Sequence, residues 1–242
     1  MGFHNLASEA VAEAAAELLT RRPTVVELGN QTLKNSKARG HIYQRFGITP
    51  PAHELTSTKD WYLSLGFTRY LAIDVNTERD AVAMDLNLDI RSHYQFDEEF
   101  DLVTNNGTGE HVFNQYQVFK NMHDLCRVDG FMVHVLPFYR WVDHGFFNYN
   151  PNLFACLAHA NQYELRGLWI ATNDTAIVHK LDPGNLSRQK GYRTTLALDS
   201  WEKDPTVVAI MKKQHEEHFR VPIQYMYGGD NITSDEIAER YR

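Results

Sequence analysis

Residues 100–112, FDLVTNNGTGEHV, place an apolar strand, a glycine turn and the start of a helix in direct succession. Residues 101–103 end an apolar run that is bounded by turn residues, which is typical of a parallel strand covered on both faces. Gly107 loosens the backbone of the turn, and Thr108 is predicted to be the N-cap of the helix that follows. Ligands of open α/β sheets bind beyond the carboxyl ends of the strands. We therefore expect a binding site at this turn.

The rest of the chain alternates strand patterns with helix patterns. Besides the strand before the turn, short apolar or β-branched runs predict strands at 24–30, 70–76, 81–87, 131–136, 163–171 and 207–211. Helical spacing of apolar residues predicts helices at 7–19, 36–46, 58–65 and 114–126, and one that starts at Pro151. This alternation predicts an α/β fold with a mostly parallel seven-stranded sheet and helices on both faces. Right-handed crossovers would then bring Gly29, Asp74, Asp85 and Asn105 to one rim.

The length of 242 residues fits one domain with a substantial core. Within it we expect an N-terminal helix in residues 1–22, a helical insert or lid at 31–68 and a C-terminal tail at 214–242, with a loop at 182–203 and a short helix at 234–240. The insert carries a basic set that fits either a lid over an anionic group or a solvated helix face, namely Lys34, Lys37, Arg39, His41 and Arg45.

Composition excludes several classes of function. The net charge of −7 argues against a broad surface for nucleic acid or anionic membranes, since both need a concentrated positive field. Glu9, Glu13 and Glu17 rule out a membrane span near the N-terminus, and that segment lacks the basic-then-apolar order of a signal peptide. Two cysteines make no disulfide framework. We expect a cytoplasmic protein that acts on a small molecule, and the composition leaves a homo-oligomer open.

A glycine after the first strand and an acid at the end of the second form the arrangement that binds adenosine in Rossmann-like folds. The backbone passes close to the ligand at Gly29, and the Asp74 carboxylate accepts hydrogen bonds from ribose hydroxyls. The turn after the first strand has one glycine and not the three of G-x-G-x-x-G, which weakens the hypothesis that the chain binds a dinucleotide. A Rossmann dehydrogenase stays as a minor alternative.

These residues resemble the motifs of class I S-adenosylmethionine-dependent methyltransferases. VVELGN resembles the first motif, AIDVN the second, MDLN the third and DLVTNNGTGEHV the fourth, and the likeness covers roughly residues 20–215. It is greatest to bacterial methyltransferase-like proteins that share the NxGTxEH and HGFFNYxP patterns. The resemblance implies a Rossmann-like methyltransferase fold and methyl transfer to a small-molecule acceptor. It also implies that S-adenosylmethionine is held by Glu27, Gly29, Asn30, Gln31, Asp74, Val75, Asp85, Leu86, Asn87, Asn105, Asn106 and Gly107.

The single glycine of the first motif supports a second hypothesis. Asn30 and Gln31 stand where the family has further glycines, and they would either bind the methionine end of the cofactor or fill its pocket. In the latter case the chain would be a catalytically inactive methyltransferase fold that serves as a binding or assembly protein.

The acceptor pocket is expected between the 105–111 turn, the end of the strand at 134–137 and the HGFFNYNP loop, because these segments follow neighbouring strands. Histidine is suited to accept a proton near neutral pH. We predict that His111, at the third position of the helix, or His134 acts as base or orienting partner. Glu110, His144 and Tyr149 complete the predicted catalytic set. Carboxylate and imidazole also bind metals, but no histidine pair has the local spacing of a metal motif, so we expect no metal.

Overall fold

The structure is a computed structural model that describes residues 2–34, 39–172, 178–182 and 201–224. One sheet runs through it in the order β3-β2-β1-β4-β5-β8-β6-β7. The strands are β1 (Thr24–Leu28), β2 (Arg69–Asp74), β3 (Val82–Ala83), β4 (Phe100–Asn106), β5 (Cys126–Pro137), β6 (Glu164–Ala171), β7 (Val178–Lys180) and β8 (Thr206–Lys212). Strands β1 to β5 pair in parallel, whereas β8 is antiparallel to both of its neighbours and β7 is antiparallel to β6.

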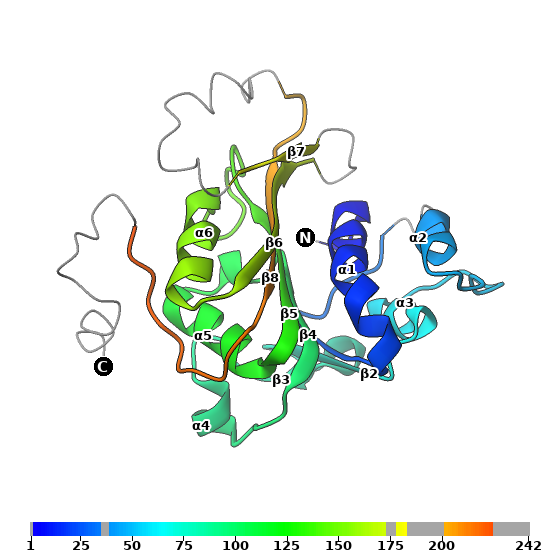
Figure 1. The fold of residues 1–242 in the computed structure, drawn as a ribbon, viewed down its shortest axis with the longest axis horizontal. Coiled ribbons are helices and arrows are strands. Elements are labelled where there is room, and N and C mark those ends of the chain that lie inside the picture. The colour runs from blue at the N-terminus through cyan, green and yellow to red at the C-terminus, as the bar shows by residue number, and fades with distance from the viewer. Residues whose placement is uncertain (1, 35–38, 173–177, 183–200, 225–242) are drawn as a thin grey trace.

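The helices cover both faces of this sheet (Figure 1). On one face lie α1 (Asn5–Leu18), α2 (Gly40–Arg45) and α3 (Thr58–Leu65), and on the other α4 (Ile90–Tyr94), α5 (Gln115–Leu125) and α6 (Pro151–Ala160). Three-residue 3-10 turns lie at Leu19–Arg21, Glu78–Asp80 and Gly109–His111. Successive side chains of each strand point to opposite faces of the sheet, so the sheet contributes to two separate apolar cores, one under each layer of helices. The expected Rossmann-like α/β architecture is confirmed.

The sheet differs from the prediction in its strand count and in its strand bounds. It has eight strands in the described residues, since β7 is an additional edge strand, where we predicted seven. The predicted strand 81–87 shortens to Val82–Ala83, because the chain turns at Asp85, whose carboxylate accepts from the Asn87 backbone N–H. The fifth strand begins at Cys126 rather than residue 131, because Cys126 already pairs with Phe100 of β4 across a bulge.

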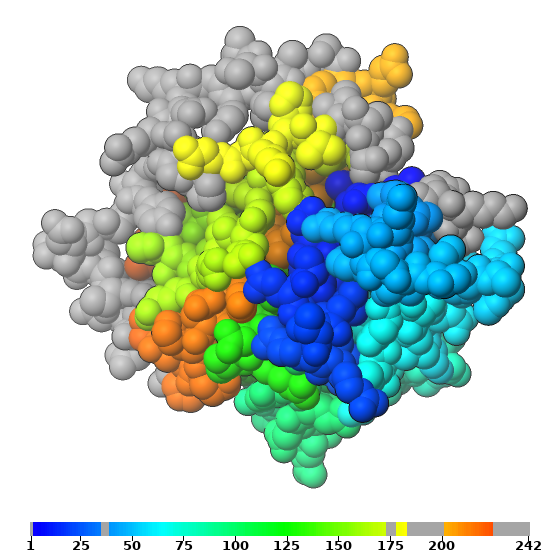
Figure 2. Space-filling model, turned by 45° about the vertical axis from the view of Figure 1, so that its right-hand side comes forward, coloured from blue at the N-terminus to red at the C-terminus, as the bar shows by residue number. Residues whose placement is uncertain are grey.

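The helical insert packs on α1. His41 and Arg45 pair with Glu9 and Glu13 of α1, and Arg39 is buried, where it donates to the Ser8 hydroxyl and the Phe3 carbonyl. In Figure 2 the N-terminal segment, in dark blue, and the segment around α2 and α3, in light blue and cyan, cover adjoining parts of the surface. These three basic side chains therefore have structural partners on α1 and the N-terminal segment, while Lys37 lies outside the described residues.

Residues 213–224 continue from β8 without helix or strand. The predicted helix 234–240, and most of the predicted loop 182–203, lie outside the described residues. None of the helices in the described ranges is both long enough and apolar enough to cross a bilayer.

Candidate functional site

A cavity of about 350 Å³ opens at the carboxyl ends of β1, β2 and β4. This is the rim at which ligands bind in open parallel sheets, and the volume lies in the range of about 300–1,000 Å³ typical of small-molecule sites. The residues that line the cavity are Gly29, Asn30, Gln31, Thr32, Asp74, Val75, Asp85, Leu86, Asn87, Gly107, Thr108, His111 and Val112. The structure thus brings nine of the twelve residues predicted to bind the cofactor to one cavity.

Thr108, in the turn after β4, is hydrogen-bonded to both ends of the turn after β1. The Thr108 hydroxyl donates to the Leu28 carbonyl at 2.7 Å and accepts from the Gln31 side-chain amide at 3.1 Å. Gly29, at φ +81°, makes this possible, since a Cβ there would lie 2.2 Å from the Thr108 hydroxyl oxygen. Only glycine allows the two turns to approach this closely. Because the hydroxyl is hydrogen-bonded to Leu28, the Thr108 side chain does not cap a helix. The segment that was expected to start the helix is a 3-10 turn at Gly109–His111.

Asp74 joins the turn after β1 to the loop after β2. One carboxylate oxygen accepts from the Asn30 backbone N–H at 2.9 Å, and the other accepts from the Asn76 side chain at 2.8 Å. The Asn30 side chain in turn donates to the Asn76 side-chain oxygen and to the Glu78 carbonyl. The carboxylate that was predicted to bind ribose is therefore held in place by both loops, with further lone pairs left to accept from a ligand.

The loop after β3 is tied to the start of α5. The Asp85 carboxylate accepts from the backbone and side chain of Asn87 at 2.9 and 2.7 Å. Asn87 then accepts from the Asn114 backbone N–H at 2.9 Å and from the Asn114 side chain at 3.1 Å. This network fixes the Asp85–Asn87 wall of the cavity relative to the start of α5.

Three residues of the predicted cofactor set lie in the sheet rather than on the cavity wall. Glu27 faces α3, accepts from the Thr58 and Tyr70 hydroxyls at 2.8 and 2.7 Å, and is fully buried, so desolvation raises its pKa to about 7. Asn105 accepts from the Gly109 N–H at 2.8 Å and thereby shapes the turn. Asn106 is buried, and its side-chain amide has no partner among the described residues.

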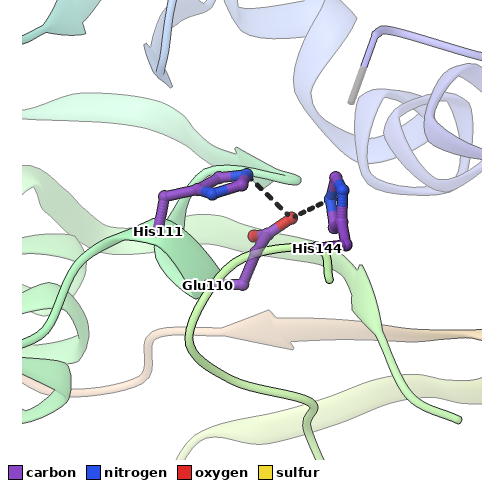
Figure 3. Close-up of side chains that lie close together, drawn as sticks. All are labelled: Glu110, His111 and His144. Carbon is purple, nitrogen blue, oxygen red and sulfur yellow. Dashed lines mark hydrogen bonds and ion pairs between the residues drawn. The ribbon is translucent and has the colours of Figure 1, made fainter. Parts of the chain in front are cut away.

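The predicted catalytic residues divide into two groups. Glu110, His111 and His144 come together at the edge of the cavity (Figure 3). One Glu110 carboxylate oxygen lies 3.3 Å from Nε2 of His144 and 3.8 Å from Nε2 of His111. Glu110 is completely buried, and desolvation raises its pKa to about 7, whereas burial lowers the pKa of both histidines. Of the three, His111 lines the cavity.

The other two predicted catalytic residues lie in the core. His134 is fully buried between Phe119 and Phe154, with neither ring nitrogen hydrogen-bonded in the part of the chain described, and burial lowers its pKa to about 3. Tyr149 is buried as well, and its hydroxyl donates to the Gln115 side chain at 2.7 Å. Neither lines the cavity formed by the described residues.

The three segments expected around the acceptor do adjoin one another. The Phe146 N–H donates to the Glu110 carbonyl and the Tyr149 N–H to the Pro137 carbonyl, each at 2.7 Å. Gly145, at φ +73°, permits the close approach, because a Cβ there would lie 2.9 Å from Cγ of Glu110. Sequence reasoning missed the cross-linking roles of Thr108 and Gln115, although both belong to the conspicuous polar stretch that follows β4.

Neither the family models nor the curated proteins contain a match to this sequence, but solved structures match its fold. The 1,6-didemethyltoxoflavin-N1-methyltransferase of Burkholderia thailandensis, with bound 1,6-didemethyltoxoflavin and S-adenosylhomocysteine, is 15% identical with a TM-score of 0.51, over 86% of this chain and 77% of that chain. TehB from Haemophilus influenzae is 12% identical with a TM-score of 0.47, over 86% of this chain and 62% of that chain, so the match spans less than two thirds of TehB.

An O-methyltransferase from a trans-AT PKS multienzyme of Brevibacillus brevis, in complex with S-adenosyl-L-homocysteine, is 10% identical with a TM-score of 0.47, over 88% of this chain and 73% of that chain. With the antiparallel β8 and the edge strand β7 left aside, the strand order is the 3-2-1-4-5-6 order of a doubly wound sheet. Together with the match to the Burkholderia enzyme, it shows that the chain has the fold of the class I S-adenosylmethionine-dependent methyltransferases.

Proposed function

We propose that this protein transfers a methyl group from S-adenosylmethionine to a small-molecule acceptor. The observation that carries the proposal is the cavity at the carboxyl rim of the sheet, with the Asp74 carboxylate on its wall beside the Gly29 turn. The fold adds support, since the Burkholderia enzyme holds S-adenosylhomocysteine and 1,6-didemethyltoxoflavin together. When bound, S-adenosylmethionine supplies an electrophilic methyl group on its sulfonium.

The two side chains that replace glycines in the first turn are compatible with a bound cofactor. Asn30 points to the outer loop, where it donates to Asn76 and Glu78, and Gln31 folds against Thr108. The cavity of about 350 Å³ persists with both side chains in place. This observation favours a cofactor-binding protein over a fold whose pocket has been filled.

Each part of the cavity wall suits one part of the cofactor. Asp74 would accept hydrogen bonds from the ribose hydroxyls, as acids at the end of a second strand do in Rossmann-like folds. The segment Asp85–Asn87 would contact the adenine, and the Gly29–Gln31 turn together with Gly107 would hold the methionine end. The methyl group would then point toward His111 at the remaining edge of the cavity.

The acceptor would bind where His111, the buried Glu110 and the loop 144–149 meet. Methyl transfer depends chiefly on alignment of the acceptor atom with the methyl group, and His111 is the histidine of the predicted set that lines the cavity. We therefore place His111 next to the acceptor. His134, which packs between two phenylalanine rings, would instead support the core beneath it.

Calorimetry with S-adenosylhomocysteine tests the proposal. We expect one site per chain, and Asp74→Ala should weaken binding by about 1–3 kcal/mol, the scale of leaving polar groups without partners. Asp97→Ala is the matched control, because Asp97 is exposed and precedes β4, at the amino edge of the sheet. No heat and no thermal stabilisation at millimolar cofactor would reject the proposal in favour of an inactive fold, and stabilisation by NADH alone would favour a dehydrogenase.

A further inference from the structure

The cluster of Glu110, His111 and His144 has spacing that fits a metal site, and the contact between His144 and Glu110 within it is a long hydrogen bond. The Glu110 oxygen lies 3.3 and 3.8 Å from the two histidine Nε2 atoms, and the three ligand atoms lie within 4.8 Å of one another. Good hydrogen bonds from nitrogen to oxygen measure about 2.7–3.2 Å. Ligands on a tetrahedral ion with bonds of about 2.0–2.1 Å are separated by about 3.4 Å. The two oxygen-to-nitrogen distances lie on either side of that value.

The second observation is an unsatisfied carboxylate. Glu110 has no exposed surface, and its other oxygen has no hydrogen-bond partner among the described residues. A buried carboxylate without a full set of partners is costly, and a cation bound between it and two imidazoles would remove that cost.

The side chains of Glu110, His111 and His144 point toward one another, and the backbone holds the segments that carry them together (Figure 3). The Phe146 N–H donates to the Glu110 carbonyl, and Gly145 lets the chain that carries His144 pass directly over Glu110. The side chains of His111 and His144 are 47% and 28% exposed, so both can shift the short distance needed to converge on an ion. His111 also lines the cavity, which gives an ion a route of entry.

We propose that Glu110, His111 and His144 bind one divalent transition-metal ion of the Zn²⁺ type. Two imidazoles and one carboxylate form one of the donor sets of catalytic transition-metal sites, zinc included, while Mg²⁺ prefers oxygen ligands throughout. Three protein ligands leave a position open to water or to an oxygen or nitrogen of the acceptor. This proposal departs from our expectation from sequence that no metal binds, and its test is independent of the test of methyl transfer.

Titration of tag-free, metal-free protein with Co²⁺ and Zn²⁺ tests the site. We expect one Co²⁺ per chain, visible absorption bands of a four- or five-coordinate ion, displacement by Zn²⁺ and no displacement by excess Mg²⁺. Zn²⁺ should also raise the unfolding temperature. Glu110→Gln, His111→Asn and His144→Asn should each lower the affinity by more than about 100-fold, because even substitutions outside the ligand shell cost about 10–100-fold.

His93→Asn is the matched control, since His93 is an exposed histidine on α4 and should leave binding unchanged. If Glu110→Gln fails to fold, the two histidine variants decide, because both side chains are partly exposed. The proposal is overturned if the wild type binds neither ion, if Mg²⁺ displaces Co²⁺, or if the histidine variants bind as the wild type does. Binding of S-adenosylhomocysteine, measured separately, reports on the methyltransferase proposal alone.

Discussion

Glu27 is an acidic side chain in the core with no cation paired to it in the described part of the chain. Its neighbours are the Thr58 and Tyr70 hydroxyls, which donate to one carboxylate oxygen and favour the charged form. Burial favours the neutral form and is the larger effect, so the pKa of Glu27 rises to about 7. Burial also raises the pKa of Tyr62 and Tyr70, and the nearby carboxylate adds to both shifts. The strand that leads to the Gly29 turn therefore carries a proton that the unfolded chain releases at lower pH.

This pKa shift makes stability depend on pH in a defined direction. The folded pKa of Glu27 is raised above the unfolded value of 4.5, so its contribution is fully present below about pH 4.5 and is lost as the pH rises through about 7. The loss between these limits is on the order of 3 kcal/mol. Urea unfolding of wild type and Glu27→Gln at pH 5 and pH 8 should show a smaller loss of stability in the variant. An identical loss in both proteins would contradict the shift.

At the scale of elements, the start of α5 links a helix to the cavity. The Asn114 side chain accepts from the Gln117 N–H at 3.2 Å as the N-cap and also donates to the Asn87 carbonyl. Sequence placed the cap at Thr108, six residues earlier, because a threonine after a glycine turn is a common N-cap. Tertiary structure overrode that signal, since the Thr108 hydroxyl lies against the Leu28 carbonyl of the neighbouring strand.

Asn114→Ala should therefore have two effects. We expect a loss of about 1 kcal/mol in stability from the lost cap. We also expect weaker binding of S-adenosylhomocysteine, because the Asp85–Asn87 wall loses one of its two hydrogen bonds from Asn114. The control variant is Asn150→Ala, which removes the N-cap of α6. The Asn150 side chain accepts a hydrogen bond from the Asn152 N–H. Asn150→Ala should cost similar stability and leave calorimetric affinity unchanged. Equal effects of the two variants on affinity would show that the Asn87 contact is not needed.

At the scale of the whole molecule, the last strand joins distant parts of the chain. Strand β8 runs between β5 and β6, and Lys213 directly after it is completely buried. The Lys213 ammonium donates to the carbonyls of His123 and Cys126, at 3.1 and 2.9 Å, and to the Glu216 carboxylate at 3.3 Å. The Lys213 ammonium thus binds the carbonyls at the end of α5, at the edge of the sheet opposite the cavity.

Lys213→Met should destabilise the protein by about 1–3 kcal/mol, because two buried carbonyls lose their donor. Cofactor affinity should not change, since Lys213 follows Lys212, which pairs with Phe131 in the amino-terminal half of β5, away from the carboxyl ends of the strands where the cavity lies. Lys212→Met is the control, because Lys212 pairs with Glu17 at the partly exposed surface, where ion pairs contribute about 0–1 kcal/mol. Denaturant unfolding of both variants checks the difference, and equal losses would contradict it.

Local patterns in the sequence determined the architecture. Short β-branched runs that alternate with amphipathic helices fix a mostly parallel sheet, and the handedness of crossovers then brings Gly29, Asp74 and Asp85 to one rim, as the cavity shows. These features depend on residues close together in the chain and on the spacing of apolar residues, so the sequence alone reveals them. The strand bounds and the edge strand β7 were missed because pairing partners far along the chain decide where a strand begins.

Only the tertiary structure decided which polar residues meet. His134 and His111 look alike in sequence, yet the register of β5 turns His134 into the core between two aromatic rings, whereas the 3-10 turn leaves His111 on the cavity wall. Glu110 and His144 are 34 residues apart, and the tight turn at Gly145 brings them together. Side-chain direction depends on strand register and on loop docking, which are set by long-range contacts that no local pattern encodes.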